Sequence, residues 1–179
     1  MFAHVIPQLL YYNMIYKVYL FDWGNTLMVD IPGFKDPMKL WPKVIAVEGA
    51  KKTLKHLSKI SKCYLVTNAQ DSNEDDIWEA LTRVNLDTYI CNIFCYRNIG
   101  CKKPSDQFYS KIISTLYINP ESIAMVGDSF ENDILGAVNN DIFGYWYNPS
   151  SGKIKKDKMY YTIHSLEELI HITNKSTTC

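Results

Sequence analysis

The stretch YKVYLFDWGNTL, residues 16–27, carries the strongest indication of how this chain folds. It begins with a run of β-branched and aromatic side chains, which is typical of a buried strand. Asp22 follows this run at once, and Gly24 and Thr26 come soon after. An acid in this place can cap a helix or form a turn, but it can also present a reactive carboxylate at the edge of a sheet. The stretch therefore predicts a strand over residues 16–21 with Asp22 at its carboxyl end.

Two later stretches repeat this arrangement of an apolar run followed by polar residues. CYLV, residues 63–66, ends in Thr67 and Asn68. IAMV, residues 123–126, is followed by a glycine and then by Asp128. Both runs are short and rich in residues that favour strands, so each is expected to be a buried strand that delivers polar groups at its carboxyl end.

Segments with helical spacing of apolar residues alternate with the strands. Helices are expected at residues 49–60, 75–84, 106–116 and 130–139, and further strands at residues 89–96 and 142–147. This alternation predicts an α/β protein with a three-layer, Rossmann-like fold, in which helices cover both faces of a central parallel sheet. In such folds ligands bind outside the carboxyl ends of the strands, where the polar residues are expected.

The length and composition suit one compact domain. The chain has 179 residues, of which 47 % are hydrophobic, and no internal repeat or Gly/Ser/Pro-rich linker divides it. A single domain is expected over residues 14–173, with an N-terminal extension over residues 1–13 and a C-terminal tail over residues 174–179. The basic segment SSGKIKKDK, residues 150–158, is expected to be a solvated connection before a last strand and helix, rather than an anion-binding patch.

The overall charge gives no sign of a polyanionic partner. Lysine plus arginine equals aspartate plus glutamate, at 19 each, so neither nucleic acid nor an anionic membrane surface is indicated. Residues 1–13 lack a basic region and a small-residue cleavage site, and no apolar run is long enough to span a membrane. Neither a signal peptide nor a membrane anchor is therefore expected. Met14 lies just before the first strand and could equally be the translational start.

The five cysteines favour a reducing, cytoplasmic location. They are odd in number and dilute in a chain that does not need disulfides for stability. Cys91, Cys95 and Cys101 could be imagined as zinc ligands, but they form no C-x-x-C pair and have no histidine nearby. Buried structural cysteines are expected instead.

Four short motifs occur in order: FDWGNTL at residues 21–27, LVTN at 65–68, CKKP at 101–104 and VGDSFEND at 126–133. Each has an ordinary structural interpretation on its own, as a capping acid, a turn or the start of a helix. Together they resemble the four motifs of the haloacid dehalogenase-like hydrolase superfamily. The likeness extends over residues 16–148, and it implies that family's fold.

The resemblance implies a role for each matching residue. Asp22 matches the nucleophile, whose carboxylate attacks phosphorus to form a phosphoaspartyl intermediate that water then hydrolyses. Thr67 matches the hydroxyl that hydrogen-bonds a phosphoryl oxygen, and Asn68 beside it helps to hold the substrate. Lys103, which directly precedes a proline, matches the lysine that neutralises the phosphate and the nucleophile, whereas Lys102 is expected to be solvated.

The same resemblance implies a magnesium site. In the family, Mg²⁺ is bound by the nucleophile carboxylate, by an acidic fourth motif and by a main-chain carbonyl two residues after the nucleophile. Here these ligands would be Asp22, Asp128 and the carbonyl of Gly24. Asp133 would contribute to catalysis through water or by supporting a ligand, although it could instead simply favour a helix amino terminus.

The sequence departs from the family at Gly24. Phosphatases of the superfamily usually carry an aspartate there, which protonates the leaving group and then activates water. General acid-base catalysis typically contributes about a hundredfold to ten-thousandfold, so its loss should weaken the hydrolysis of esters with poor leaving groups. Relatives without this aspartate include dehalogenases and phosphonate-cleaving enzymes, which rely on an inserted helical cap. Both common cap positions, residues 28–47 and 69–88, are short here.

A minimally capped site would be open, so it could accept a macromolecule or use a neighbouring subunit of a homo-oligomer as its lid. Four apolar residues of the first insertion could form a rim around the site or pack on the core: Phe34, Met38, Leu40 and Trp41. The favoured function is a magnesium-dependent phosphomonoesterase that acts on a phosphorylated small molecule or macromolecule. Two alternatives stay open: a weakly active or inactive relative that binds a phosphorylated ligand or a protein partner, and a dehalogenase or C–P-cleaving enzyme.

Overall fold

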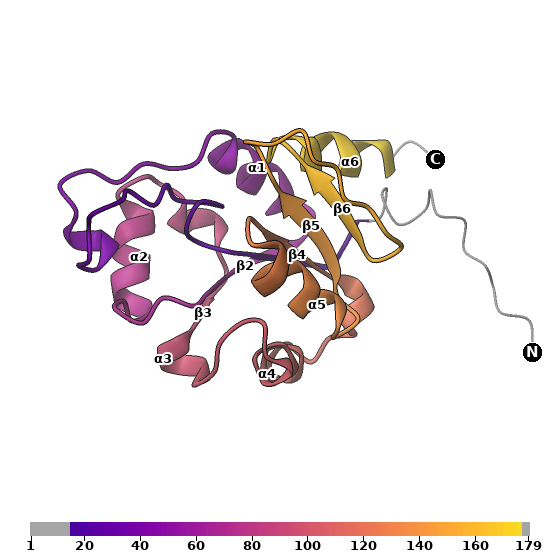
Figure 1. The fold of residues 1–179 in the computed structure, drawn as a ribbon, viewed down its shortest axis with the longest axis horizontal. Helices are drawn as coiled ribbons and strands as arrows, with labels where there is room; N and C mark the ends of the chain where they lie inside the picture. Colours follow the sequence, from indigo (N-terminus) through magenta and orange to yellow (C-terminus); the bar gives the residue numbers. More distant parts are fainter. Residues whose placement is uncertain (1–14, 177–179) are drawn as a thin grey trace, which may run out of the picture.

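A computed structural model describes residues 15–176 of the protein (Figure 1). The predicted N-terminal extension, residues 1–13, lies outside the described residues, as do positions 177–179 of the predicted tail. Residues 174–176 of that tail belong to the last helix, α6 (Glu168–Ser176), and so continue a regular element. The division into one domain with two terminal segments stays a prediction.

Six parallel strands form one central sheet in the order β3-β2-β1-β4-β5-β6. They are β1 (Val18–Phe21), β2 (Lys62–Thr67), β3 (Ile93–Cys95), β4 (Ile123–Gly127), β5 (Phe143–Tyr147) and β6 (Tyr160–Ile163). β1 lies at the centre, and all four of its residues are buried, as expected for a strand that is covered on both faces. The predicted α/β fold with a parallel sheet is confirmed.

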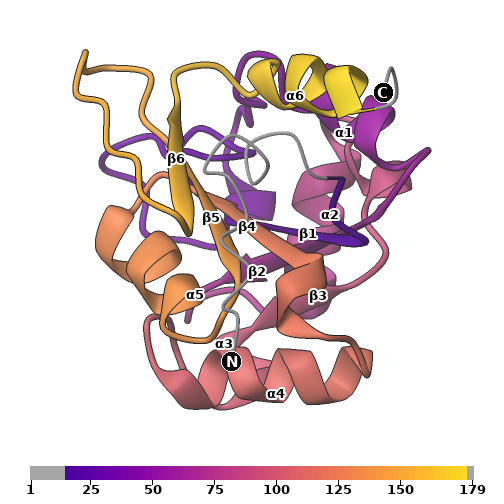
Figure 2. The same cartoon turned by 90° about the vertical axis from the view of Figure 1, so that its right-hand side faces the viewer.

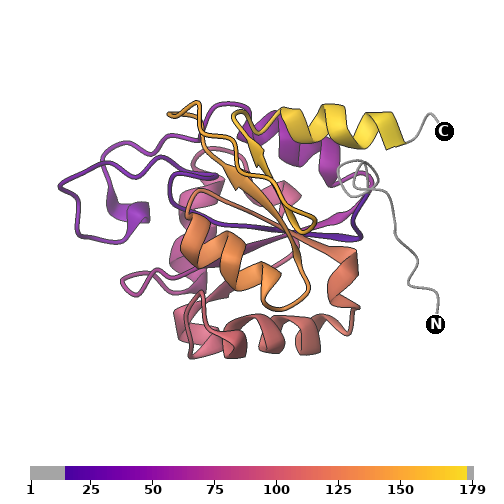
Figure 3. The same cartoon turned by 45° about the vertical axis from the view of Figure 1, so that its right-hand side comes forward.

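Helices cover both faces of the sheet, and the alternation of side chains along β1 divides the core between them (Figures 2 and 3). Tyr19 and Phe21 pack with α1 (Ala50–Leu57), α2 (Glu74–Thr82) and α6. On the opposite face, the remaining strand residues pack with α4 (Asp106–Leu116) and α5 (Gly136–Val138). Each helix buries one apolar stripe, so the spacing of apolar residues in the sequence is satisfied on both sides.

Two predicted elements differ from the structure. Only Ile93–Cys95 of the predicted strand 89–96 forms a strand, because 3₁₀ helix η3 (Asp87–Tyr89) precedes it and α3 (Tyr96–Ile99) follows it. The side chain of Asn98 ends the strand: it accepts a hydrogen bond from the Cys95 N–H at 2.9 Å and donates one to the Ile93 carbonyl at 2.9 Å. The predicted helix 130–139 begins as a wider π-helical turn, η5 (Phe130–Leu135), which leads into α5.

The two connections considered in the sequence as positions for a cap are short in the structure. The connection after β1 contains only 3₁₀ helix η2 (Met38–Leu40), and α2 accounts for most of the other one. Lys39 forms an ion pair with Asp76 of α2 at 2.8 Å, and Arg83 donates hydrogen bonds to the carbonyls of Lys39 and Trp41, both at 2.8 Å. The first connection is thus fastened to the body of the molecule. No helix within residues 15–176 has the length and apolar character needed to cross a membrane.

The cysteines and the basic segment conform only in part to expectation. Cys63 and Cys95 are buried, whereas Cys91 is exposed and Cys101 is half-buried. The prediction of burial was therefore wrong for Cys91, which lies before β3, and for Cys101, which lies in the loop after α3. The basic segment connects β5 to β6. Elsewhere in the chain, 3₁₀ helix η4 (Pro120–Ser122) directly precedes β4. Residues 152–158 are exposed, as expected for a solvated connection.

Candidate active site

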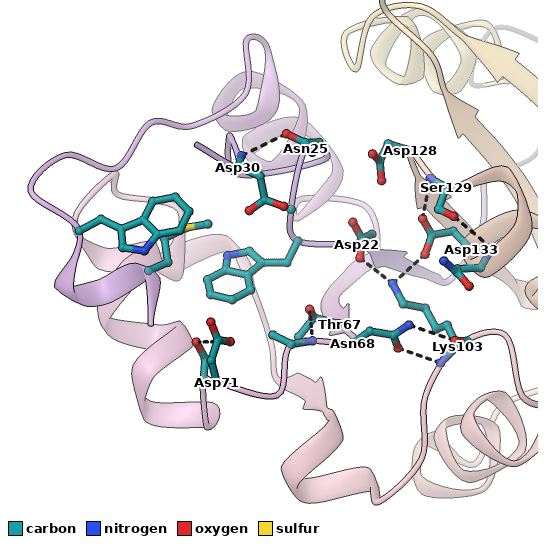
Figure 4. Close-up of a pocket in the computed structure, with 17 residues that line it drawn as sticks. Asp22, Asn25, Asp30, Thr67, Asn68, Asp71, Lys103, Asp128, Ser129 and Asp133 are labelled. Atoms are coloured by element: carbon teal, nitrogen blue, oxygen red, sulfur yellow. Dashed lines mark hydrogen bonds and ion pairs between the residues drawn. The ribbon is translucent and has the colours of Figure 1, made fainter. Parts of the chain in front are cut away.

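A cleft of about 360 Å³ opens at the carboxyl ends of β1, β2 and β4 (Figure 4). Because these three strands are parallel neighbours, the residues that follow them meet at one edge of the sheet. All the predicted site residues line this cleft: Asp22, Gly24, Thr67, Asn68, Lys103, Asp128 and Asp133. Segments up to 111 residues apart in the sequence, from Asp22 to Asp133, therefore form one site.

Lys103 lies at the centre of the cleft wall and is only 4 % exposed. Its Nζ donates to Asp22 Oδ1 at 2.6 Å, to Asp133 Oδ1 at 2.7 Å and to the Val66 carbonyl at 3.2 Å. These three acceptors match the three N–H donors of an ammonium group. Burial by itself would lower the pKa of Lys103, but the carboxylates of Asp133 and Asp22 outweigh it and raise that pKa, so the side chain stays charged.

Asn68 holds the backbone of Lys103 in place. Its Oδ1 accepts the Lys103 N–H at 2.8 Å, and its Nδ2 donates to the Lys103 carbonyl at 2.9 Å. The amide of Asn68, which directly follows β2, thus orients Lys103 in the loop between α3 and α4. Direct contact of Asn68 with a substrate stays a prediction. Thr67 is buried, and its Oγ1 accepts the Ala69 N–H at 3.1 Å. A hydroxyl that accepts this bond still has a hydrogen to donate.

Thr26 joins the two loops that carry carboxylates. Its Oγ1 donates to Asp22 Oδ2 at 3.2 Å and accepts the Asp128 N–H at 3.1 Å. Thr26 is fully buried, so this bridge is shielded from water. Sequence reasoning noted Thr26 only as a neighbour of Asp22, because its bond to Asp128 joins positions 102 residues apart.

Asp133 is buried beneath the cleft, in the π-helical turn η5. Its Oδ2 accepts the Ser129 N–H at 3.0 Å, and the Tyr109 hydroxyl donates to its carbonyl at 2.9 Å. The Asp133 carboxyl occupies the space that a side chain at Gly127 would need, so glycine is required there. Burial raises the pKa of the Asp133 carboxyl, and the Lys103 ammonium acts against this rise.

The aspartates of the cleft outnumber its cations. Among the described residues that line it, Lys103 is the one lysine or arginine. Burial, together with repulsion by Asp22, raises the pKa of Asp128 to about 6, although Lys103 opposes the shift. Burial, and then repulsion by Asp22 and Asp71, likewise raises the pKa of Asp30. The site as a whole therefore carries more negative charge than its own cation neutralises.

This charge distribution fits a divalent cation. Carboxylate oxygens of Asp22, Asp128 and Asp133 all lie within 4.8 Å of one another. Hard oxygen donors of this kind suit Mg²⁺, which binds through one or two carboxylates and keeps several waters. Asp133 is the most deeply buried of the three, and both of its oxygens accept hydrogen bonds, from Lys103 and Ser129. The more accessible Asp22 and Asp128 are therefore the better candidates for direct ligands.

The cleft also has an apolar wall, which the sequence indicated only in part. Trp23, Met38 and Trp41 line it and are buried. Of the four residues considered for a rim, Met38 and Trp41 pack on the core while they line the cleft. Phe34 and Leu40 are 43 % and 64 % exposed, and Phe34 stacks on Trp41 with ring centroids 5.1 Å apart.

A family model of haloacid dehalogenase-like hydrolases matches residues 37–141, more than half of the chain. The chain belongs to this hydrolase family. Glyceraldehyde 3-phosphate phosphatase from Pyrococcus furiosus is 30 % identical over 135 residues, which cover 72 % of this chain and 55 % of that protein. The hydrolase chain thus spans about half the length of this curated relative.

Solved structures share the fold of this hydrolase. An uncharacterized protein from Listeria monocytogenes superposes with a TM-score of 0.73 at 22 % identity, over 87 % of this chain and 98 % of that one. The putative HAD-hydrolase YfnB from Bacillus subtilis, in a crystal form bound to magnesium, superposes with a TM-score of 0.70 at 19 % identity, over 89 % and 99 % of the two chains. These structures confirm the fold, and the match of the family model confirms the predicted superfamily membership.

Replacing Asp128 should stabilise the metal-free hydrolase at neutral pH. Because the pKa of Asp128 rises from 3.8 to about 6 on folding, the folded state binds its proton more tightly, and stability falls as pH rises between these values. The full shift corresponds to about 3 kcal/mol, which solvent screening of this half-buried group reduces to about 1 kcal/mol. We expect Asp128→Asn to raise the free energy of unfolding by that amount at pH 7.5 and to leave it unchanged at pH 4.

Denaturant unfolding in the presence of a chelator measures this effect at the two pH values. The exposed Asp36 provides the control, because Asp36→Asn makes the same chemical change at a residue that does not line the cleft. A destabilised Asp128→Asn protein at pH 7.5 would contradict the prediction.

Proposed function

We propose that this hydrolase is a magnesium-dependent phosphomonoesterase that acts through a phosphoaspartyl intermediate on Asp22. One observation carries the proposal: the Asp22 carboxylate is held by Lys103 at 2.6 Å and by Thr26 at 3.2 Å, facing an open cleft next to two further carboxylates. Two hydrogen bonds fix the carboxylate in one orientation, which favours attack in line with a departing group.

Each neighbour of Asp22 has a role in this proposal. Lys103 and Thr67 bind the equatorial oxygens of the phosphoryl group and neutralise the charge that develops on them. Asn68 keeps Lys103 in position through its two backbone hydrogen bonds. Asp22, Asp128 and the Gly24 carbonyl would hold Mg²⁺, and Asp133 would support them. When bound, Mg²⁺ would offset the repulsion between the aspartates and the phosphate.

We further propose a small phosphomonoester as the substrate. The cleft volume of about 360 Å³ and its apolar wall suit a compound with a short carbon skeleton beside its phosphate. The relative from Pyrococcus furiosus is named for glyceraldehyde 3-phosphate, a compound of this class. A macromolecular substrate, a subunit that serves as a lid and a cytoplasmic location stay predictions from the sequence.

The proposal predicts phosphate release that depends on magnesium. Purified protein should hydrolyse 4-nitrophenyl phosphate with added Mg²⁺, and excess chelator should lower the rate by at least about a hundredfold, since Asp22 and the phosphate would then repel each other. Nitrophenolate absorbance follows the reaction, and returning Mg²⁺ should restore the rate. Activity that survives exhaustive chelation would contradict the role of the metal.

Gly24 supports a second candidate, a weakly active or inactive relative that binds a phosphorylated ligand. This second candidate predicts a protein that binds a phosphate ester but does not hydrolyse it. Titration calorimetry with inorganic phosphate and Mg²⁺ distinguishes the two candidates, because the binding module would bind phosphate in the cleft while showing no turnover of 4-nitrophenyl phosphate.

A further inference from the structure

The space left by the missing side chain at Gly24 is filled by another carboxylate. A Cβ atom built on Gly24 would lie 2.5 Å from Asp30 Oδ2, 3.0 Å from Asp30 Cγ and 3.2 Å from Asp30 Oδ1. A methyl group at position 24 would therefore fit only if the Asp30 carboxyl moved away. The carboxyl group that is absent from position 24 in the sequence is thus present beside position 24 in space.

A tight turn brings Asp30 back to this place. The Asn25 N–H donates to the Met28 carbonyl at 2.6 Å, and the Asp30 N–H donates to Asn25 Oδ1 at 3.1 Å. The Val29 N–H donates a hydrogen bond to the Ile45 carbonyl at 2.9 Å, which holds this turn against a later part of the same connection. Figure 4 shows Asp30 beside Asn25, to which it is hydrogen-bonded. The Asp30 carboxyl thereby lies next to Gly24.

The position of Asp30 gives it access to both the reacting centre and solvent. Its side chain lines the same cleft as Asp22 and Lys103, yet the residue is exposed. A group that protonates a leaving oxygen and later deprotonates water needs both properties. Thr26 and Lys103, which contact Asp22 from other directions, are buried in the body of the protein.

We propose that Asp30 is the general acid and base of this hydrolase, in place of the carboxyl group that Gly24 lacks. This proposal rests on the phosphatase function proposed above. In the first step, a bond forms between Asp22 and phosphorus while the bond to the leaving oxygen breaks. That oxygen takes the electron pair and a proton from Asp30, and an alcohol departs.

The second step regenerates both residues. A water molecule gives a proton to the Asp30 carboxylate while its oxygen bonds to phosphorus. The bond between phosphorus and Asp22 then breaks, and its electron pair returns to the Asp22 carboxylate. Inorganic phosphate leaves, and Asp30 again carries the proton that it needs for the next ester.

The test compares two leaving groups in Asp30→Asn and wild-type protein. Nitrophenolate departs without help, whereas an alkoxide from an alkyl phosphate such as glycerol phosphate needs a proton. In single-turnover measurements, we expect Asp30→Asn to slow alcohol release by at least about a hundredfold and nitrophenolate release by less than about threefold. Acid quenching should trap more phosphoenzyme in the variant, because water activation is also impaired.

Gly24→Ala provides a second variant that leaves the Asp30 residue itself intact. The Cβ atom would displace the Asp30 carboxyl, so alcohol release should fall in the same way. If both variants act through Asp30, the double variant should be no more than about threefold slower than Asp30→Asn alone. Asp36→Asn, which removes an exposed carboxylate from the same connection, should leave both rates unchanged.

The outcomes separate this proposal from the function on which it rests. Equal losses with both leaving groups, no loss with either, or multiplicative losses in the double variant would overturn the role of Asp30 while leaving the phosphatase function intact. Wild-type protein that releases neither nitrophenolate nor alcohol would overturn both. Denaturant unfolding of each variant establishes that the measured rates belong to folded protein.

Discussion

Asp22→Asn should abolish phosphate release, lowering kcat with 4-nitrophenyl phosphate by at least about a thousandfold. The reason is that an amide is too weak a nucleophile to attack phosphorus. The fold should survive, because Lys103 keeps its bonds to Asp133 Oδ1 at 2.7 Å and to the Val66 carbonyl at 3.2 Å. Nitrophenolate absorbance and denaturant unfolding measure the two effects.

Asp36→Asn again serves as the matched control, since it makes the same chemical change at an exposed site. Acid-quenched wild-type protein should carry a phosphoryl group that is labile to base and to hydroxylamine, and Asp22→Asn should carry none. Residual turnover of more than a few per cent in Asp22→Asn would mean that another group, or water itself, attacks the phosphorus.

Lys103→Met should destabilise the metal-free protein by about 3 to 5 kcal/mol at pH 7.5. Methionine fills a similar volume, but it leaves the carboxylates of Asp22 and Asp133 in the cleft wall without the cation that both contact. Phosphate release should also fall by at least about a hundredfold, because Lys103 faces the charge that develops on the phosphoryl oxygens. Denaturant unfolding and the nitrophenolate assay report these changes separately.

Lys102 offers a control of the same residue type at the adjacent position. Its Nζ lies 5.3 Å from the centroid of the Tyr96 ring, an interaction worth about 0.5 to 1 kcal/mol at a partly exposed site. Lys102→Met should therefore cost no more than this and should leave phosphate release unchanged. Equal destabilisation by the two substitutions would contradict the central place that we assign to Lys103.

The fold was largely predictable because its determinants are local. The apolar run before Asp22 and the one before Thr67 each specify a buried strand, and parallel strands bring their carboxyl ends to one edge. The motif positions then placed Lys103 and Asp128 in the same cleft, as the structure has them. The predicted strand 89–96 was too long, because the side chain of Asn98 folds back on the backbone and ends it.

The contacts within the cleft were less predictable, because they join residues that no local pattern relates. The bond between Thr26 and the Asp128 N–H depends on how two loops pack. Asn68 looks like a substrate ligand in the sequence, yet its amide bonds the Lys103 backbone. Such side-chain contacts follow from the three-dimensional arrangement of the loops rather than from hydrophobic periodicity.

Gly24 illustrates the difference between what the sequence determines and what only the tertiary structure decides. The sequence by itself determined the strand, the position of Asp22 after it and the absence of a carboxyl group two residues later. Only the tertiary structure decided that the chain turns back and places Asp30 in the vacant space. The physical reason is steric: a glycine leaves room for whatever the fold brings near, and the identity of that neighbour depends on the path of the following loop.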